Sequence, residues 1–214
     1  MNIPLILFTV LELIGTVAFA LSGTMTGLKY KLDIFGVLLL SITAALGGGV
    51  IRDLLIGRIP PMMFQDYKYL MAAAAAGMIL FLLAKLAKTF YRANEQRIET
   101  WNNVFDALGL GAFTVTGVQA GMQAGYGDNG FLLVFLALLT GIGGGVLRDL
   151  LVQRMPLIFH KRIYALADIL GACLYLFLYR RGVDVVTTSA VTIAAVFIIR
   201  MLATRYHWNL PKAD

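Results

Sequence analysis

Long apolar stretches separated by short polar segments dominate the chain. Seven of these stretches approach or exceed the length of about 20 mostly apolar residues that crosses a bilayer. They cover residues 4–28, 33–56, 66–88, 100–123, 129–152, 162–180 and 183–203. The pattern predicts an all-α membrane protein with seven transmembrane helices.

Composition leads to the same class. Hydrophobic residues make up 59% of the chain and charged residues 14%, whereas a soluble domain carries about 25% charged residues. The mean hydropathy is +0.80. The net charge of +6 comes from basic residues near the ends of apolar stretches, which is typical of membrane-flanking segments, so we expect no nucleic-acid partner. Aromatic residues near the span ends are expected in the two interfacial belts: Tyr67, Tyr69, Trp101, Tyr164, Tyr206 and Trp208.

The first apolar stretch is expected to be retained. Residues 18–20 (Ala-Phe-Ala) match the small-x-small pattern of a signal-peptide cleavage site. A signal peptide begins with a basic segment, but the first lysine is Lys29, and Glu12 interrupts the apolar run. We therefore interpret residues 4–28 as the first span.

An internal repeat organises the chain. Residues 47–60 (GGGVIRDLLIGRIP) return 96 positions later as residues 143–156 (GGGVLRDLLVQRMP), with ten of the fourteen positions identical. An offset of 94 aligns the first spans of the two units and matches Glu12 with Asp106. The same offset matches Gly15, Phe19, Ser22, Gly23 and Gly27 with Gly109, Phe113, Thr116, Gly117 and Gly121.

The span count predicts the domains and their relative orientation. We expect a three-helix repeat at residues 1–90, a polar linker at 91–99, a second three-helix repeat at 100–181, and a seventh helix with a cytoplasmic tail at 182–214. Because three is odd, the second unit enters the membrane from the opposite side. The sequence therefore predicts an inverted repeat, which is typical of transporters with a pseudo-two-fold axis in the membrane plane.

The lysines and arginines predict the orientation. Thirteen of the 18 fall on one side of the predicted spans and five on the other. The richer side is expected to be cytoplasmic. This places the N-terminus outside and the C-terminus in the cytoplasm, with Arg200 counted among the cytoplasmic flanking residues.

Three consecutive glycines occur inside the second and fifth predicted spans: Gly47, Gly48, Gly49 and Gly143, Gly144, Gly145. Each glycine weakens a helix by about 1 kcal/mol relative to alanine, and unwound backbone at membrane depth is tolerated only where it is buried in protein or lines a water-filled cavity. We therefore favour a kink beside a pathway. Close helix packing is the alternative, and it is the preferred interpretation for the Gly-x-x-x-Gly pairs at residues 23–27 and 117–121.

Charged residues follow both triplets directly, as Arg52-Asp53 and Arg148-Asp149. Ionisable residues inside spans are costly and by default mark functional sites. Neighbours on a helix point about 100° apart and pair poorly. A two-fold axis would instead allow each arginine to meet an acid of the other unit. The alternative is that both pairs lie at the membrane interface and hold helix ends.

Further polar residues fall inside the predicted spans. Glu12 and Asp106 occupy matched positions, where a carboxylate either attracts cations or neutralises an arginine of the glycine motif. Asp168 has no acidic counterpart and is either a pathway residue or a local helix-pairing residue. Hydroxyls that could line a path come from Ser41, Thr43 and Thr140.

The sequence carries no signature of an enzyme. It contains no Walker loop, no dinucleotide-binding glycine pattern and no His/Cys metal cluster. We therefore expect no catalytic residues, no bound metal and no cofactor.

The doubled Gly-Gly-Gly-x-x-Arg-Asp motif, in a pattern of three, three and one spans, resembles the bacterial and archaeal members of the trimeric intracellular cation (TRIC) channel family, which is also labelled a glycine transporter domain family. The resemblance covers almost the whole chain. It implies a homotrimer among membrane lipids with a pore in each protomer, and kinks at residues 47–49 and 143–145 of the second and fifth helices. It also implies permeation of monovalent cations, chiefly potassium.

Three functional hypotheses result. The preferred one is a potassium-permeable channel of the bacterial inner membrane, in which the kinked spans line the pore and the Arg-Asp pairs and first-span acids shape the gate. The second is a secondary transporter of a small amino acid such as glycine, working by alternating access. The third is a non-conducting scaffold, which leaves the duplicated Arg-Asp pairs without a role.

Overall fold

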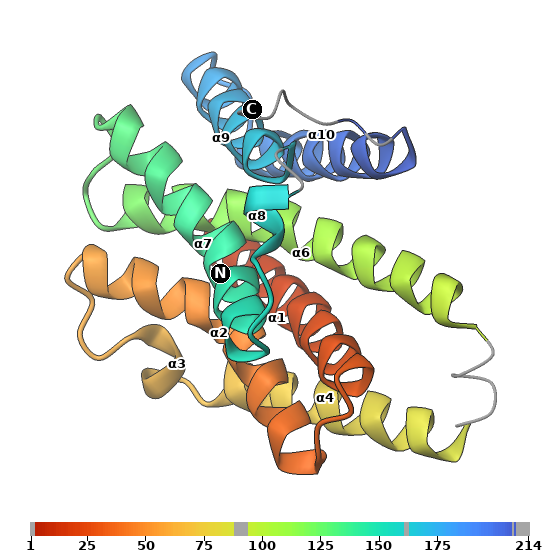
Figure 1. Ribbon diagram of the computed structural model, residues 1–214. Coiled ribbons are helices and arrows are strands. Elements are labelled where there is room, and N and C mark those ends of the chain that lie inside the picture. The colour runs from red at the N-terminus through yellow and green to blue at the C-terminus, as the bar shows by residue number, and fades with distance from the viewer. Residues whose placement is uncertain (1–2, 88–93, 161–162, 207, 209–214) are drawn as a thin grey trace.

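The structure, a computed structural model, describes residues 3–87, 94–160, 163–206 and 208, and this part of the chain contains helices and no strand. Its helices are α1 (Ile3–Lys29), α2 (Ile34–Leu55), α3 (Met62–Gln65), α4 (Lys68–Leu86), α6 (Glu95–Gln123), α7 (Gly130–Leu151), α8 (Leu157–His160), α9 (Ile163–Arg180) and α10 (Val185–Arg205) (Figure 1). The elements α3 and α8 are single turns of four residues.

Six of these helices are long and apolar enough to cross a membrane: α1, α2, α4, α7, α9 and α10. The remaining long helix, α6, is more polar because it carries Asp106 and Gln119, both buried. It begins at Glu95, so its first turn lies within the predicted polar linker. The predicted class, an all-α membrane protein, is confirmed.

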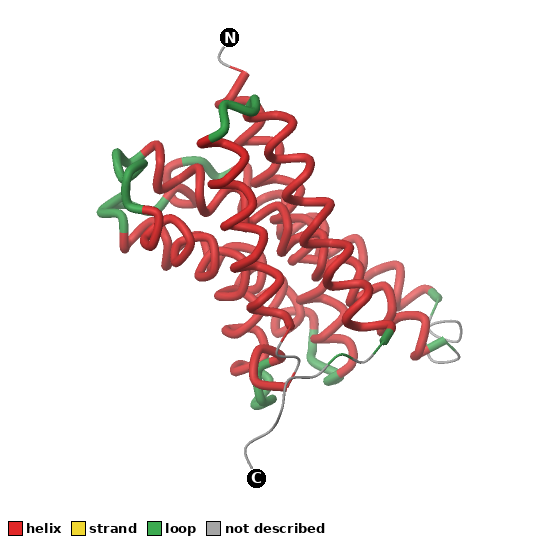
Figure 2. The backbone as a smooth tube through the Cα atoms, turned by 90° about the horizontal axis from the view of Figure 1, so that it is seen from above, coloured by secondary structure: helices red, strands yellow, loops and turns green. Residues whose placement is uncertain are grey.

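Four helices form the centre of the bundle. Helix α1 packs on α2 and α6, and α7 packs on the same two helices. Helix α4 covers α1 and α2 on one side, α9 covers α6 and α7 on the other, and α10 packs on α9 and α6 (Figure 1). The view from above shows most loops at the ends of the helices (Figure 2). The first three long helices and the next three therefore make matched contacts.

Polar caps fix where the two matched central helices begin. The Asp33 side chain accepts a hydrogen bond of 2.7 Å from the N–H of Gly36 at the start of α2. The Asn129 side chain accepts one of 3.0 Å from the N–H of Leu132 at the start of α7. Each cap satisfies a backbone donor that has no partner within the helix. The repeat is thus preserved at the helix starts as well as in the glycine motif.

The two units meet through matched positions of α1 and α6. Phe19 of α1 and Phe113 of α6 stack, with ring centroids 5.3 Å apart and an interplanar angle of 6°. Gly15 faces the ring of Phe113 and Gly109 faces the ring of Phe19, and neither glycine has room for a side chain. The contacts are reciprocal: a glycine of the first unit packs on a phenylalanine of the second, and the matched glycine of the second unit packs on the matched phenylalanine of the first.

The Gly-x-x-x-Gly pairs bring neighbouring helices of each unit together. A Cβ on Gly23 would lie 2.8 Å from the Cα of Ser41 in α2. A Cβ on Gly117 would lie 2.5 Å from the Cα of Ala137 in α7. Both distances are too short for a side chain, so these glycines allow close helix packing, as the sequence predicts.

The glycine triplets lie where α2 and α7 cross. A side chain on Gly48 would overlap the carbonyl oxygen of Thr140, and one on Gly144 would overlap the carbonyl oxygen of Ala44. Both helices keep helical backbone through the triplets, so the backbone is not unwound there. Glycine at this crossing lets two backbones approach closely, which is the alternative that the sequence left open.

Candidate functional site

A buried ion-pair cluster, the first cluster, joins α1 and α2. In the last turn of α2, Arg52 donates from Nη1 to Oε1 of Glu12 at 2.5 Å and from Nε to Oδ1 of Asp53 at 2.9 Å. The other carboxylate oxygen of Asp53 accepts the N–H of Met62 at 2.8 Å. The three charged side chains are 2%, 9% and 2% exposed, so their attraction is stronger than it would be in water.

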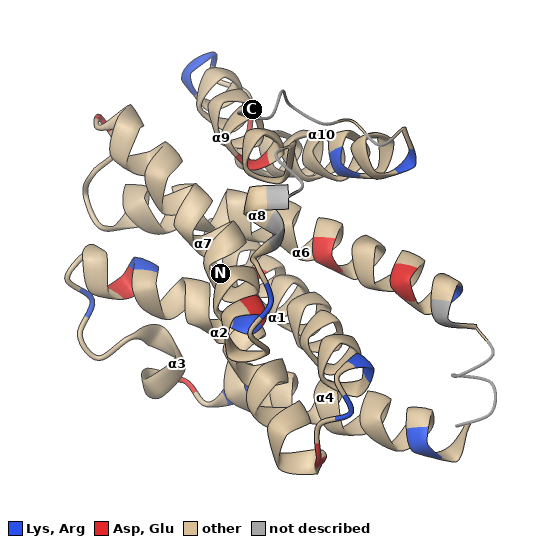
Figure 3. Ribbon diagram, in the orientation of Figure 1, with Lys and Arg blue, Asp and Glu red and all other residues tan. Residues whose placement is uncertain are grey.

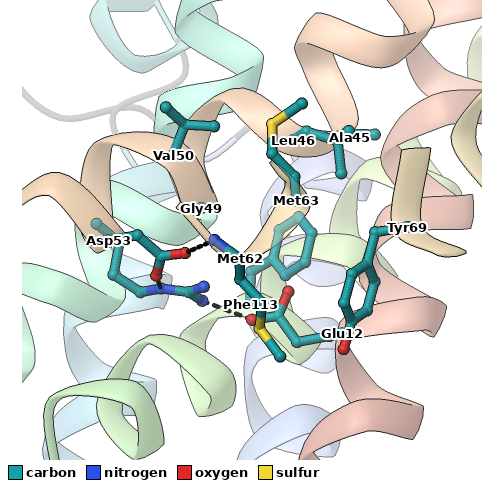
Figure 4. Close-up of a pocket in the computed structure, with 11 residues that line it drawn as sticks. Glu12, Ala45, Leu46, Gly49, Val50, Asp53, Met62, Met63, Tyr69 and Phe113 are labelled. Carbon is teal, nitrogen blue, oxygen red and sulfur yellow. Dashed lines mark hydrogen bonds and ion pairs between the residues drawn. The ribbon is translucent and has the colours of Figure 1, made fainter. Parts of the chain in front are cut away.

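A small cavity lies beside the first cluster. Its volume is about 20 Å³, and its polar lining comes from Glu12, Arg52, Asp53 and Tyr69. Figure 4 shows the Glu12 side chain between Asp53 and Tyr69, next to Phe113. A space of this size holds about one water molecule. A hydrated ion is therefore too large for this cavity.

A matched cluster, the second cluster, joins α6 and α7. Arg148 donates from Nη1 to Oδ1 of Asp106 at 3.2 Å and from Nε to Oδ1 of Asp149 at 3.0 Å. The same Nη1 donates to the hydroxyl oxygen of Ser22 in α1 at 2.6 Å, and that hydroxyl donates to Oδ1 of Asn102 at 2.7 Å. Figure 3 shows the charged positions of α2 and α7 near the C-terminal ends of these helices. The helix dipole favours the positive charge of an arginine in this last turn.

A second cavity lies beside the second cluster and repeats the first one. Its volume is about 10 Å³, and its lining includes Gly145, Arg148, Asp149 and Tyr164. Glycine, arginine, aspartate and tyrosine take the same places in the first cavity. The duplication has therefore preserved a site as well as a motif.

Arg200 of α10 joins the second cluster, which the sequence did not predict. Its Nη2 lies 3.7 Å from Oδ2 of Asp106, and its Cζ lies 4.3 Å from the centre of the Tyr164 ring. Its residue exposure is 2%, so it is a buried residue rather than a cytoplasmic flanking charge. The available signal was its position inside the predicted span at residues 183–203, before the end of the apolar run.

The structure corrects the expected pairing of the arginines. Arg52 and Arg148 each bind the aspartate next to them in sequence, because Nε lies close enough to the backbone to reach it while Nη1 extends to another helix. The acids on those other helices, Glu12 and Asp106, belong to the same repeat as the arginine that they bind. The arrangement that a two-fold axis would allow, in which each arginine meets an acid of the other unit, is not found for Arg52 or Arg148. Two hydrogen bonds of the second cluster cross between the units, from Arg148 to the Ser22 hydroxyl and from that hydroxyl to Asn102.

The prediction of an interfacial position is also wrong for two of the aromatic residues. Tyr69 and Tyr164 are each 3% exposed and lie beside the ion-pair clusters. They occur almost at the repeat offset, which was the signal that set them apart from the other aromatics. The remaining four belt candidates, Tyr67, Trp101, Tyr206 and Trp208, are exposed.

The predicted hydroxyls mostly bind backbone carbonyls. The Ser41 hydroxyl lies 3.1 Å from the carbonyl oxygen of Ala20 and 3.3 Å from that of Ala73, so it joins α2 to α1 and α4. The Thr140 hydroxyl donates to the carbonyl oxygen of Leu136 in its own helix at 2.6 Å. Thr43 is partly exposed. Whether any of them contacts a permeating ion stays a prediction.

Asp168 forms a separate buried polar contact in α9. Its Oδ1 is hydrogen-bonded to the Thr114 hydroxyl in α6, and its Oδ2 has no partner. The Thr114 hydroxyl also lies 2.8 Å from the carbonyl oxygen of Leu110. No lysine or arginine of the described chain forms an ion pair with Asp168. Its hydrogen bond joins α9 to α6, apart from the two clusters, and a role beside a path stays a prediction.

The site offers no metal centre within the part of the chain that the structure describes. No group of three or more His, Cys, Asp or Glu side chains is placed there to hold a metal ion. What the clusters do contain is a set of buried ion pairs that join neighbouring helices.

Comparison with protein families finds the repeat independently. The family model described as "Glycine transporter" matches residues 9–85 and again residues 103–180. The two matches correspond to the two units of the duplication.

Relatives with similar length span almost the whole chain. The UPF0126 inner membrane protein YadS of Escherichia coli (strain K12) is 33% identical over 203 residues, which cover 94% of this chain and 93% of the relative. The UPF0126 membrane protein YvgT of Bacillus subtilis (strain 168) is 33% identical over 205 residues, which cover 94% of each chain.

Solved structures of cation channels share the fold. A prokaryotic TRIC channel crystallised in 0.5 M KCl superposes with a TM-score of 0.85 at 31% identity and covers 96% of this chain and 99% of that one. A TRIC cation channel studied for its conductance superposes with a TM-score of 0.81 at 32% identity and covers 97% of both chains. The TRIC orthologue from Rhodobacter sphaeroides gives a TM-score of 0.83 at 29% identity over 94% of this chain and 98% of that one.

Proposed function

Because the chain belongs to the TRIC and UPF0126 family of membrane proteins, we propose that it is a monovalent cation channel of the bacterial inner membrane, permeable to potassium. The observation that carries this proposal is its full-length likeness to TRIC cation channels. The duplicated buried clusters support it, because each places charges and a cavity beside the crossing of α2 and α7.

We further propose that the two three-helix units are inverted in the membrane and that α6 crosses it as well, giving seven spans. The reciprocal contacts of Phe19 with Gly109 and of Phe113 with Gly15 support this, since a two-fold axis produces such exchanged pairs. The lysine and arginine distribution supports an outer N-terminus and a cytoplasmic C-terminus.

The proposed path runs beside α2 and α7. The ribbon of α2 changes direction along its length in Figure 1, which supports a bend within this helix. An arginine next to a cation path repels the ion unless an acid holds it. The bonds of Arg52 to Glu12 and of Arg148 to Asp106 provide such acids. We infer that exchange of these partners opens and closes the path.

The assembly in this proposal is a homotrimer with a pore in each protomer, embedded in membrane lipids. The Rhodobacter sphaeroides relative is described as a trimeric intracellular cation channel, which supports the trimer. Many large apolar side chains of the single chain are exposed, among them Phe35, Leu86 and Phe131, and lipid or neighbouring protomers would cover them.

Flux into liposomes tests the proposal against the glycine transporter hypothesis. Reconstituted protein should pass potassium down its gradient and should show no saturable uptake of labelled glycine. The variant Arg52→Gln should change potassium flux, whereas Arg181→Gln, which removes the same charge from an exposed turn, should not. Saturable glycine uptake without potassium flux would contradict the channel.

A further inference from the structure

Helix α10 supplies a buried charge to the second cluster only. Arg200 lies 3.7 Å from Asp106 through Nη2 and Oδ2. Helix α10 packs on α6 and α9, and it has no counterpart in the repeat. The first cluster gains only Arg58, whose Nη1 is 3.8 Å from Oδ1 of Asp53 and whose side chain is 27% exposed. The two matched clusters therefore differ in one buried arginine.

The formal charges of the clusters differ as a result. Arg52 balances only one of the two acids Glu12 and Asp53, so the buried first cluster has a formal charge of −1. In the second cluster, Arg148 and Arg200 balance Asp106 and Asp149, and the formal charge is zero. Arg58 offsets the difference weakly, because water screens a partly exposed charge at the rim.

The first cavity also offers an unused oxygen. The Tyr69 hydroxyl is buried and has no hydrogen-bond partner, and its ring stands beside Glu12 (Figure 4). A hydroxyl oxygen next to a carboxylate suits a hard monovalent cation, which prefers oxygen ligands. The cavity of about 20 Å³ has room for one ion of water size once its water shell is replaced.

The matching tyrosine of the second cavity cannot serve in the same way. The Tyr164 hydroxyl also lacks a partner, but the guanidinium of Arg200 lies over its ring at 4.3 Å. Arg200 also leaves Nε and Nη2 without hydrogen-bond acceptors. It does not line the second cavity itself, and its charge lies against the Tyr164 ring and Asp106. A cation placed there meets a like charge that the first cavity lacks.

We propose that Arg200 excludes cations from the second cluster, so that a monovalent cation resides at the first cluster, between Glu12 and Tyr69. This inference rests on the proposed channel function and makes the two clusters differ in cation binding. The difference comes from α10, because the two repeat units alone would give two equivalent cation sites.

A purely structural arginine would hold α10 against α6 without changing where cations bind. The two roles are separated by the potassium concentration at which single-channel conductance is half-saturated. We expect Arg200→Gln to lower that concentration about tenfold, because a charged low-dielectric cleft raises the local concentration of counter-ions by at least that factor. Arg200→Lys keeps the charge and should behave as the unchanged protein. Arg205→Gln removes an exposed charge from the same helix and is the matched control.

A second measurement does not depend on conduction. Bound cation stabilises the folded state by mass action, so potassium chloride should raise the melting temperature above that in N-methylglucamine chloride of equal ionic strength. Tyr69→Phe and Glu12→Gln should abolish this difference, whereas Tyr164→Phe should leave it unchanged. If Arg200→Gln fails to fold, these three variants still decide the location of the cation.

The outcomes separate the two levels of the proposal. Absence of potassium current in the unchanged protein would contradict the channel itself. Potassium current with the same half-saturation in Arg200→Gln would contradict only the role of Arg200. Potassium stabilisation that survives in Tyr69→Phe, or is lost in Tyr164→Phe, would contradict the location of the cation at the first cluster.

Discussion

Phe19 and Phe113 stack on each other at matched positions of the two repeats, with ring centroids 5.3 Å apart. A residue that contacts its own counterpart lies next to the two-fold axis that we propose for the two units. Both rings are buried, at 0% and 3% exposure, and each also packs on a glycine of the other unit. This contact locates the centre of the duplicated fold.

Truncation of either ring should destabilise the protein to a similar extent. We expect Phe19→Ala and Phe113→Ala each to lower the free energy of unfolding by about 3–5 kcal/mol, since each leaves a cavity in the core. The double variant should cost less than the sum by about 0.5–1.5 kcal/mol, the coupling expected of an aromatic pair. Unfolding in mixed micelles measures these values. Strict additivity would show that the rings do not interact.

Glycine at the α2–α7 crossing should be irreplaceable. Gly48→Ala and Gly144→Ala push a Cβ into a carbonyl oxygen of the facing helix, so each should lower stability by about 1–3 kcal/mol through overpacking. Gly49→Ala is the matched control, because its Cβ would lie 3.6 Å from its nearest neighbour. Melting temperatures in detergent test the contrast. Equal effects of the three variants would refute close packing as the reason for the triplets.

Removing the arginine of the first cluster should cost more stability than removing Glu12. Glu12→Gln leaves Arg52 with one acid, and Arg52→Gln leaves two buried acids without their arginine. Arg52→Gln is expected to lose about 3–5 kcal/mol, as for other broken buried pairs, and Glu12→Gln less, because Arg52 and Asp53 still balance each other. The double variant should lose less than the sum of the two. Unfolding free energies measure the coupling, and open probability in a bilayer should shift in the same variants. A stable protein with unchanged gating in Glu12→Gln would contradict the ion-pair gate.

Two buried aspartates should respond differently to amidation. Asp168 binds only the Thr114 hydroxyl, whereas Asp106 lies beside both Arg148 and Arg200. The Thr114 hydroxyl has one proton but faces two oxygens, the Leu110 carbonyl and Oδ1 of Asp168. An asparagine amide at position 168 can donate a hydrogen bond to the Thr114 hydroxyl oxygen, which a carboxylate cannot. Asp168→Asn should change stability by less than about 1 kcal/mol, and Asp106→Asn should cost about 3 kcal/mol or more. A larger loss in Asp168→Asn would show that its charge is needed.

The proposed orientation can be tested by thiol labelling. The single native thiol is removed first by Cys173→Ala. An impermeant maleimide added to intact cells should then label Gly127→Cys, in the turn between α6 and α7, and should not label Lys29→Cys at the end of α1. The opposite labelling would reverse the orientation, and labelling of both or neither would show that the two positions lie on one side.

Most features that occur in both repeat units could be predicted from the sequence. The matched motifs indicated the paired helices, the paired acids and the paired glycines, because each copy supports the interpretation of the other. Glu12, Arg52 and Asp53 do form one cluster, and Asp106, Arg148 and Asp149 form its counterpart, as follows from their contacts.

Two kinds of feature could not be predicted: those that depend on side-chain conformation and those that depend on α10, which has no counterpart in the repeat. The sequence gives the face of the helix on which an arginine lies but not the positions of its Nε and Nη1 atoms, so the pairing of Arg52 with Asp53 was missed. Arg200 has no repeat counterpart, and an arginine near the end of an apolar stretch is usually a flanking charge. Its burial follows from the packing of α10 on α6 and α9, which the hydropathy pattern does not contain.

Single-channel recording of the purified protein in a planar bilayer under a KCl gradient tests the central claim most directly. The account predicts unitary currents that reverse close to the potassium equilibrium potential and exceed the turnover rates of transporters. A bilayer without unitary currents, or with currents that reverse at the chloride equilibrium potential, would contradict a cation channel.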